Sequence, residues 1–271
     1  MATTIPPAVQ PILDEYISLV NHALPGLLDG LYLHGSIALD AFTPGLSDID
    51  AITLTSRRCR PDDIAALQSI HQTLAQRYPT PQWEGSYLQW QDLGGSEATI
   101  PPHPHIHDGT VYANGHHDIN GVTWWILKHR GIAVIGPPPE QLDLEVDLDQ
   151  LIADMHHNMQ TYWARFTTDP RRIAWLFSDF GIQWTVLGVL RQLYTFREHA
   201  ITSKIGAGHY ALKHVPTRWH RLIQEAINIR DGGHASLYRS RVMRAIEAWN
   251  FLKLIISTCN TDAAKQQMQA E

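Results

Sequence analysis

Four residues near the start of the chain have side chains suited to phosphate and metal chemistry. Gly35 and Ser36 interrupt an apolar run, and after eleven further residues Asp48 and Asp50 follow with one isoleucine between them. Side chains alternate faces along a strand, so both carboxylates would point the same way. Like charges held this close favour a bound cation, and Mg²⁺ prefers such oxygen ligands together with the phosphate oxygens of its substrate.

The Gly-Ser pair supplies what a phosphate group needs. Glycine lets the backbone approach closely, serine offers a hydroxyl donor, and backbone amides at the start of a short helix attract anions. Gly35 and Ser36 would hold the outer phosphates of a nucleotide while Asp48 and Asp50 hold metal against the phosphate being attacked. The pattern therefore predicts nucleotidyl transfer. The alternative, two solvated acids at the entrance of a strand, leaves the Gly-Ser spacing unexplained.

A third carboxylate is expected on a neighbouring strand. Glu84 in the segment QWEGSYLQW is the best candidate, because of its order in the chain and its apolar setting. Its expected role is that of a general base, which takes the proton from a substrate hydroxyl as that oxygen attacks the α-phosphate in line. A surface acid on a strand is the alternative reading.

The elements that must position these residues follow from apolar periodicity and turn residues. We expect residues 94–115, which are rich in Pro, Gly and His, to form a loop. The expected elements are helices within 9–28 (with a possible earlier stop at Pro25-Gly26), 37–42, 62–77 and 122–129, and strands at 31–33, 49–55, 83–90 and 132–135.

The second half of the chain is expected to be a helical bundle. Helical segments are expected near 147–166, 171–199, 207–214, 217–230 and 236–258, and the polar tail from Thr261 is expected to fray. The fold class is therefore an α+β domain with a small mixed sheet, residues 1–143, followed by an all-α domain, residues 144–271. One apolar stripe of the bundle is expected to be core: Trp175, Leu176, Phe180, Trp184, Leu187, Leu190 and Tyr194.

Charge is divided unevenly between the halves of this 271-residue chain. The net charge is -6, with 15 acidic against 6 basic residues up to Asp143 and 12 against 15 after it. An acidic first half argues against general nucleic-acid binding and suits metal ions or a cationic substrate. The two cysteines offer no disulfide framework, and no signal peptide or membrane span is apparent, so we expect a soluble cytoplasmic protein.

Three stretches of the sequence resemble those of known enzyme families. The Gly-Ser pair, eleven residues and the motif DID resemble the motif of the polymerase β-like nucleotidyltransferases. GIAVIGPPPEQL at 131–142 and LYTFREHAITSKIGAGHYALKHVP at 193–216 resemble the linker and helical domain of the AadA-type aminoglycoside adenylyltransferases. Those enzymes transfer AMP from ATP to streptomycin and spectinomycin. The similarity covers most of residues 30–230.

The resemblance implies a polymerase β-like fold for the first domain, ATP as co-substrate and Mg²⁺, as two ions. Lys204 also makes sense by charge, because the acidic half cannot neutralise a triphosphate alone and needs a cation from the second half. The implied roles are Asp48 and Asp50 as Mg²⁺ ligands, Ser36 and Ser47 as phosphate contacts, Glu84 as base, and Lys204 as a triphosphate contact.

In this family, acids and an aromatic residue of the helical domain meet the cationic drug. Trp175 and Asp179 lie near the corresponding place, and Asp118 lies near a position that faces the active site. Arg191 is a weaker candidate for a site residue. The partners are therefore a small cationic acceptor and ATP, with neither membrane nor nucleic acid expected.

Three alternatives stay open. A nucleotidyltransferase of this fold could act on a metabolite, a protein or tRNA, and a regulator could bind nucleotide without catalysis. His103, His105 and His107 alternate and could share one side of an extended segment that binds Zn²⁺, although a solvated loop or the rim of a substrate cleft is favoured.

Overall fold

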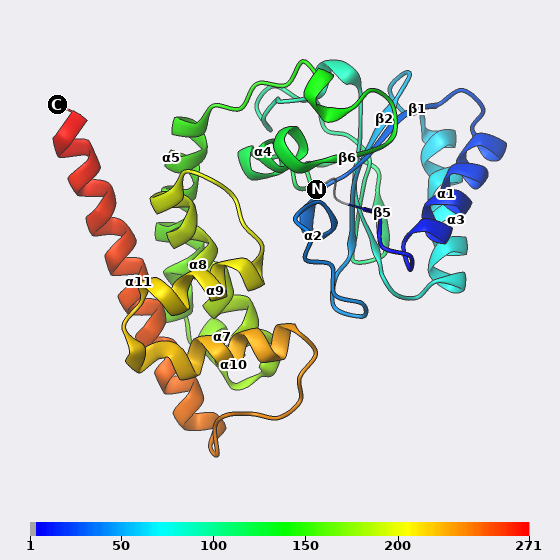
Figure 1. The fold of residues 1–271 in the computed structure, drawn as a ribbon. Helices are drawn as coiled ribbons and strands as arrows, with labels where there is room; N and C mark the ends of the chain where they lie inside the picture. Colours follow the sequence, from blue (N-terminus) through cyan, green and yellow to red (C-terminus); the bar gives the residue numbers. More distant parts are fainter. Residues whose placement is uncertain (1–3, 271) are drawn as a thin grey trace. The chain divides into compact units, whose positions relative to one another are not determined.

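The computed structural model describes the chain from Thr4 to Ala270, with side chains described as far as Thr261. These residues form two compact units, one ending at Asp147 and the other beginning at Leu148 (Figure 1). The first contains a mixed sheet with helices, and the second contains helices without any strand among its described residues. The mixed sheet and the many helices expected from the sequence are confirmed.

The sheet has six strands in the order β5-β4-β3-β2-β1-β6. β2 and β3 are parallel neighbours, and the other four pairs are antiparallel. The elements of this unit are α1 (Gln10–Ala23), β1 (Leu28–Leu33), α2 (Gly35–Ala38), β2 (Ile49–Thr55), α3 (Pro61–Arg77), β3 (Trp83–Leu88), η1 (Trp90–Asp92), β4 (His105–His107), β5 (Thr110–Tyr112), α4 (Gly121–Arg130), β6 (Ile132–Ile135) and η2 (Pro139–Gln141).

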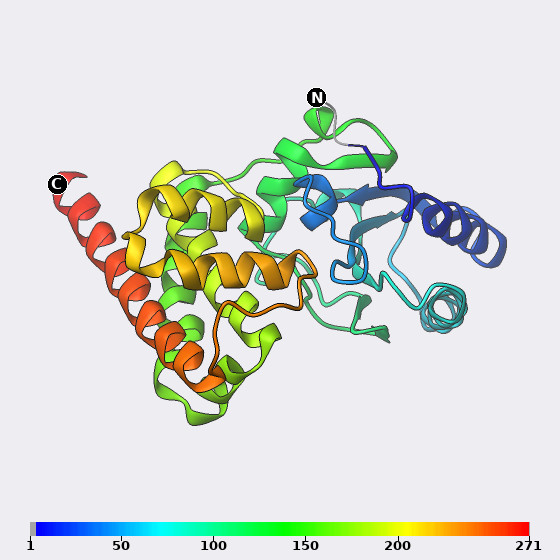
Figure 2. The same cartoon turned by 60° about the horizontal axis from the view of Figure 1, so that its bottom comes forward.

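The side chains of the sheet divide between two apolar cores. Ile49 and Ala51 of β2 pack with the apolar faces of α1 and α3, which lie side by side on one face (Figure 2). Ile52 and Leu54 pack in the second core, which contains apolar residues of α4. Since alternate residues share a face, Asp50 lies on the same face as Ile52 and Leu54. The face that carries the carboxylate is therefore opposite α1 and α3.

Two short strands lie in the segment that the sequence analysis expects to be loop, so that expectation is wrong. β4 pairs with β3 through Ile106 opposite Gly85, and β5 pairs with β4 through Val111 opposite Ile106. Ile106 and Val111 are buried. Each strand has three residues with one apolar side chain inward, which is too short for periodicity to stand out from the surrounding Pro, Gly and His.

The helical unit is arranged around α8, which packs against α9, α10 and α11 (Figure 1). The Trp163 ring approaches α8 closely because residue 188 is glycine: a Cβ on Gly188 would lie 2.1 Å from that ring. The elements are α5 (Leu148–Asn158), the π-helical turn η3 (Met159–Trp163), α6 (Arg165–Thr168), α7 (Pro170–Ile173), η4 (Ala174–Phe177), α8 (Asp179–Glu198), α9 (Lys204–His214), η5 (Thr217–Trp219), α10 (His220–Arg230) and α11 (Arg241–Ala270).

The helix expected over 171–199 is broken at Ser178, which corrects the sequence prediction. The Ser178 hydroxyl caps α8 by accepting a hydrogen bond from the Gly181 amide, 2.9 Å away. A Cβ on Gly181 would lie 1.9 Å from the carbonyl oxygen of Trp175, so glycine allows the sharp turn. In addition, α11 continues as a helix beyond Thr261, where fraying was expected.

None of the described helices alone has both the length and the apolar composition needed to cross a bilayer. The pair Pro170–Phe177 and Asp179–Glu198, bent by 109°, meets these criteria only when its two parts are taken together.

A buried arginine joins three helices of this unit. Arg244 of α11 donates to Glu225 of α10 and to Asp179 of α8, each over 2.7 Å. Glu225 is fully buried and also accepts hydrogen bonds from the Ser236 hydroxyl and the Leu237 amide. This network ties the start of α8 to α10 and α11. A buried charge whose partner is removed is strongly destabilising.

We therefore expect Arg244→Met to lower the free energy of unfolding by about 3–5 kcal/mol, because Glu225 would stay buried without its countercharge. Chemical denaturation followed by circular dichroism measures this loss. Arg221→Met is the matched control, since Arg221 pairs with Glu247 at the surface and its loss should destabilise the protein far less. Equal losses in both variants would contradict the network's importance.

Candidate active site

Asp50 and Glu84 lie directly opposite each other on the parallel strands β2 and β3. The side chains of Tyr87 and Leu88 enter opposite cores, so Glu84 shares the face of Leu88, which is also the face of Asp50. Asp48 immediately precedes β2, and its negative charge raises the pKa of Asp50, so it lies within electrostatic range. The structure thus brings together the three carboxylates that the sequence singled out.

Gly35 is required by the position of the Asp50 carboxylate. Its φ is +57°, and a Cβ there would lie 1.8 Å from Asp50 Oδ2. The next residue, Ser36, donates its backbone amide to the same oxygen over 3.4 Å. The Gly-Ser pair at the start of α2 therefore contacts the carboxylate directly, which the sequence analysis did not predict. The Ser36 hydroxyl is buried and finds no hydrogen-bond partner in the described part of the chain.

The electrostatics of this cluster are unfavourable without a cation. Burial, together with the negative charges of Asp118, Asp48 and Glu84, raises the pKa of Asp50 to about 7. The hydrogen bond from the Ser36 amide acts in the opposite direction and does not compensate. Four carboxylates with this much mutual repulsion could hold a divalent metal ion.

Asp118 approaches the cluster from the segment before α4. Its backbone has a φ of +55°, and its carboxylate accepts a hydrogen bond from the Asn120 side chain over 3.1 Å. The other oxygen lies 3.9 Å from Nε2 of the buried His34. Burial lowers the pKa of His34, although the charge of Asp118 opposes that shift. The charge of Asp118 thus acts on Asp50, and the substrate contact that the resemblance implied for Asp118 stays a prediction.

Two histidines flank Glu84, a feature that the sequence analysis missed. His107 Nδ1 lies 3.3 Å from Glu84 Oε1, and His117 Nε2 lies 3.5 Å from Oε2. Burial alone would raise the pKa of Glu84, but interaction with His117 and the charges of both histidines lower it overall. The alternation around His107 was visible in the sequence, but nothing there indicated that His117 would join it.

The other histidines of that segment behave differently from expectation. His103 is buried, and its Nε2 lies 3.3 Å from the Ser86 hydroxyl, so the solvated-loop reading is wrong for this residue. His105 stacks between Tyr112 and His117. The three alternating histidines therefore do not form a shared metal site, since Nε2 of His103 is hydrogen-bonded to the Ser86 hydroxyl.

Ser47 and Lys204 have local partners. The buried Ser47 hydroxyl accepts a hydrogen bond from the Thr43 amide over 3.0 Å and so closes the turn that leads to Asp48. Lys204 begins α9 in the helical unit, with its Nζ 4.2 Å from the centre of the Trp184 ring. The phosphate contacts assigned to both residues stay predictions.

Part of the apolar stripe expected as core is exposed, which corrects that prediction. Trp175 is 47% exposed and Phe180 is 55% exposed, whereas Leu187 and Leu190 are buried. Trp175 contacts Phe180, which stacks on Trp184 with ring centres 5.7 Å apart. We call Trp175, Phe180 and Trp184 the aromatic patch. It lies where α8 begins, and the exposure arises because the break at Ser178 turns the chain there.

Asp179 lies next to this patch, but its charge is partly neutralised. Its carboxylate is about half exposed and accepts the 2.7 Å hydrogen bond from Arg244. Arg191, the weaker site candidate, donates its Nε to the carbonyl oxygen of Thr202. That bond gives Arg191 a structural role between α8 and α9.

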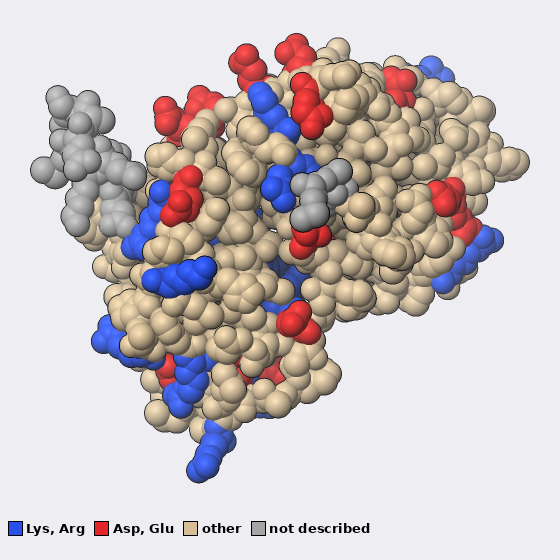
Figure 3. All heavy atoms as spheres, in the orientation of Figure 1, with Lys and Arg blue, Asp and Glu red and all other residues tan. Residues whose placement is uncertain are grey.

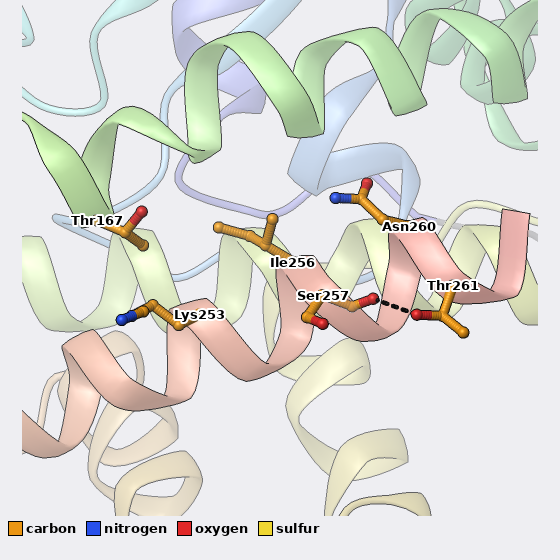
Figure 4. A pocket seen from close by; sticks show the side chains of 6 residues that line it. All are labelled: Thr167, Lys253, Ile256, Ser257, Asn260 and Thr261. Carbon is orange, nitrogen blue, oxygen red and sulfur yellow. Dashed lines mark hydrogen bonds between the residues drawn. The ribbon is translucent and has the colours of Figure 1, made fainter. Parts of the chain in front are cut away.

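A pocket of about 520 Å³ in the helical unit contains none of the predicted site residues. It is lined by Thr167 and by one face of α11, where Thr261 donates to the carbonyl oxygen of Ser257 (Figure 4). Among the described residues that line it, Lys253 is the one ionisable residue, and none of them offers an acidic group to a metal ion or a cationic substrate.

Residues 151–253 match the family model described as aminoglycoside adenylyltransferase, C-terminal domain. Among solved structures, the chain is similar to spectinomycin adenyltransferase AAD(9) from Enterococcus faecialis, crystallised with ATP and spectinomycin. The TM-score is 0.63 at 13% identity, covering 90% of this chain and 99% of that one. No curated protein matches the chain. The family match confirms the resemblance seen in the sequence, and the structural match shows a shared fold.

Asp50 should make the metal-free protein less stable as pH rises. Its folded pKa of about 7 exceeds the ordinary 3.8, so the native state binds the proton more tightly than the unfolded state. The stability that Asp50 contributes is therefore complete below about pH 4 and is lost as pH rises through 7. In EDTA, Asp50→Asn should melt higher than the wild type at pH 8, with a gain that shrinks towards pH 4.

Each unit of pKa shift corresponds to about 1.4 kcal/mol, which gives an upper bound of a few kcal/mol for the gain. Thermal melts at several pH values measure it. Asp40→Asn, which removes an exposed acid on the turn after α2, is the matched control. A gain for Asp50→Asn that is the same at pH 4 and pH 8 would argue against repulsion within the carboxylate cluster.

Proposed function

We propose that this chain, which belongs to the AadA-type aminoglycoside adenylyltransferases, transfers AMP from ATP to a hydroxyl of a cationic aminoglycoside or aminocyclitol such as streptomycin or spectinomycin. The observation that carries the proposal is the convergence of Asp48, Asp50 and Glu84 on one face at the β2–β3 pair. As a nucleotidyltransferase, the enzyme needs such carboxylates for its metal and its base.

The carboxylate cluster fits Mg²⁺. Burial first, and then the negative charges of Asp118, Asp48 and Glu84, raise the pKa of Asp50, and a bound cation would relieve both effects. Asp48 and Asp50 are the residues that would hold the metal, in keeping with its preference for carboxylate oxygens. When bound, Mg²⁺ would neutralise charge on the phosphates of ATP. Gly35 keeps Asp50 in place by leaving room for its carboxylate.

Glu84 is the proposed general base. Its pKa is lowered overall, so it is ionised at neutral pH and can accept a proton. It takes the proton from the acceptor hydroxyl as that oxygen attacks the α-phosphorus. The new oxygen–phosphorus bond forms as the bond from the α-phosphorus to the bridging oxygen breaks, and pyrophosphate leaves with that oxygen.

Ser36, Ser47 and Lys204 are the proposed contacts for the triphosphate. The buried Ser36 hydroxyl has its donor available for a phosphate oxygen. Ser47 is proposed as the second contact because the turn that its hydroxyl closes places it directly before Asp48. Lys204 would add positive charge from the helical unit. The first half has a net charge of -9 up to Asp143, so it cannot neutralise the triphosphate without an added cation.

The acceptor is proposed to be cationic because the groups around the transfer site are acidic. Asp118 adds a partly exposed carboxylate beside Asp50 and is the proposed contact for an acceptor amine. In the helical unit, Trp175 and Asp179 offer an exposed ring and a carboxylate. An aromatic face and a carboxylate together suit a cationic sugar ring.

A different acceptor is the second candidate, and the surface charge bears on it. The face drawn in Figure 3 shows basic side chains in separate groups with acidic ones between them. Nucleic acids draw much of their affinity from many phosphate contacts to Lys and Arg, so this face does not favour tRNA. A nucleotide-binding regulator is disfavoured because Asp48, Asp50 and Glu84 are all present and close together.

Pyrophosphate release tests the proposal directly. With ATP, Mg²⁺ and a panel containing streptomycin, spectinomycin and neutral acceptors, we expect release with a cationic member. Glu84→Gln should lower that rate by at least about 10²-fold while ATP affinity is retained, because only the proton transfer is lost. ATP binding without turnover on any acceptor would support a regulator, and a normal rate in Glu84→Gln would refute the assigned base.

Trp175→Ala should weaken acceptor binding without affecting ATP. We expect the KM for the acceptor to rise by about fivefold, in line with about 1 kcal/mol for a cation on an exposed aromatic face, and the KM for ATP to stay constant. Phe177→Ala is the matched control, since Phe177 is exposed to a similar degree and lies outside the aromatic patch. Equal effects of the two substitutions would exclude a specific role for Trp175.

A further inference from the structure

Glu84, His107 and His117 form a side-chain cluster of their own beside the transfer site. They come from β3, from β4 and from the loop that precedes α4. One potential ligand atom of each lies within 4.8 Å of the other two. All three side chains are partly buried, with Glu84 19% exposed. Three segments therefore place two imidazoles and one carboxylate around one point.

The donor set is that of a transition-metal site. Imidazole nitrogen and carboxylate oxygen bind Zn²⁺ at about 2.0–2.2 Å in a tetrahedron, and such bonds place neighbouring ligand atoms roughly 3.3–3.5 Å apart. His107 Nδ1 lies 3.3 Å from Glu84 Oε1, and His117 Nε2 lies 3.5 Å from Glu84 Oε2, so each imidazole approaches a different oxygen of the one carboxylate. Two histidines and one glutamate leave a fourth position for water, an arrangement that Zn²⁺ adopts in catalytic sites.

The surroundings hold the imidazoles in this arrangement. The Ser86 hydroxyl donates to the carbonyl oxygen of His117 over 2.8 Å, and the His117 ring stacks on His105. The rings of His107 and His117 lie 4.5 Å apart. Supporting contacts of this kind fix ligand orientation and raise metal affinity.

A hydrogen bond between His107 and Glu84 is the competing explanation for their proximity, and it does not account for His107 Nδ1. His107 Nδ1 is shielded from solvent and finds no hydrogen-bond partner among the described residues, even though Glu84 Oε1 lies 3.3 Å away. The nitrogen is thus close to the carboxylate without being aligned for a hydrogen bond. A shielded, unpartnered nitrogen beside a carboxylate has its lone pair available for a metal ion.

We propose that Glu84, His107 and His117 bind a divalent transition metal of the Zn²⁺ class, at a site separate from that proposed for Mg²⁺. Binding itself does not depend on the proposed adenylyl transfer. It has a consequence for that reaction, because a Glu84 carboxylate bound to metal cannot accept a proton. The transition metal is therefore an inhibitor of transfer. The two histidines give the site an affinity for transition metals that three carboxylates alone would lack.

The test measures Zn²⁺ affinity of the tag-free full chain, by competition with a chromophoric chelator, without ATP or acceptor. We expect one tight equivalent, weakened by at least about 100-fold in both His107→Ala and His117→Ala. His209→Ala, on the exposed face of α9, is the matched control and should bind like the wild type. Because the His107 side chain is 46% exposed, its removal leaves no buried cavity, and a melt confirms folding.

The absence of a tight equivalent would overturn the proposal, as would a loss below about tenfold in either histidine variant. Inhibition of transfer is a separate readout. If pyrophosphate release is found, added Zn²⁺ should suppress it in the wild type and much less in His107→Ala. If no acceptor supports transfer, the affinity measurement still decides the metal site, so failure of the two proposals can be told apart.

Discussion

Repulsion between carboxylates on one face of the β2–β3 pair is the constraint on which this site depends. The parallel register sets Asp50 opposite Glu84, and Asp48 and Asp118 add their charges from the adjoining segments. A fold gains nothing from burying such a cluster alone, since it raises the pKa of Asp50 to about 7. The cluster destabilises the metal-free fold, as expected where the side chains are arranged to bind a cation.

The rest of the first unit keeps that arrangement rigid. The antiparallel neighbours β1 and β4 flank the parallel pair, and apolar cores on both sides fix which residues of β2 face the site. Gly35 leaves space for the Asp50 carboxylate. The Glu84 carboxylate lies between the imidazoles of His107 and His117, with one of them beside each oxygen. The two acids thus differ in their surroundings: one is crowded by negative charge and the other is paired with imidazoles. That difference suits a metal ligand and a base.

Strong local patterns could be predicted from the sequence, whereas features set by distant contacts could not. The strand over 49–55 and its two aspartates follow from apolar runs and alternation, and the structure has β2 at those residues. β4 was missed because three residues carry too little periodicity, and His117 joins Glu84 only through the fold. The exposure of Trp175 depends on the turn at Ser178, where a serine cap and a glycine outweigh an apolar pattern that continues across it.

Proton release on metal binding measures the protonation of the Asp50 carboxylate in the metal-free protein. Because the pKa of Asp50 is about 7, a divalent ion that binds its ionised form at pH 7 must displace about half a proton. Titration calorimetry with Mn²⁺ in buffers of different ionisation enthalpy counts these protons. We expect release near one half of a proton at pH 7, a decline towards zero by pH 9, and loss of that component in Asp50→Asn. Binding without proton release at pH 7, or release unchanged in Asp50→Asn, would contradict this expectation.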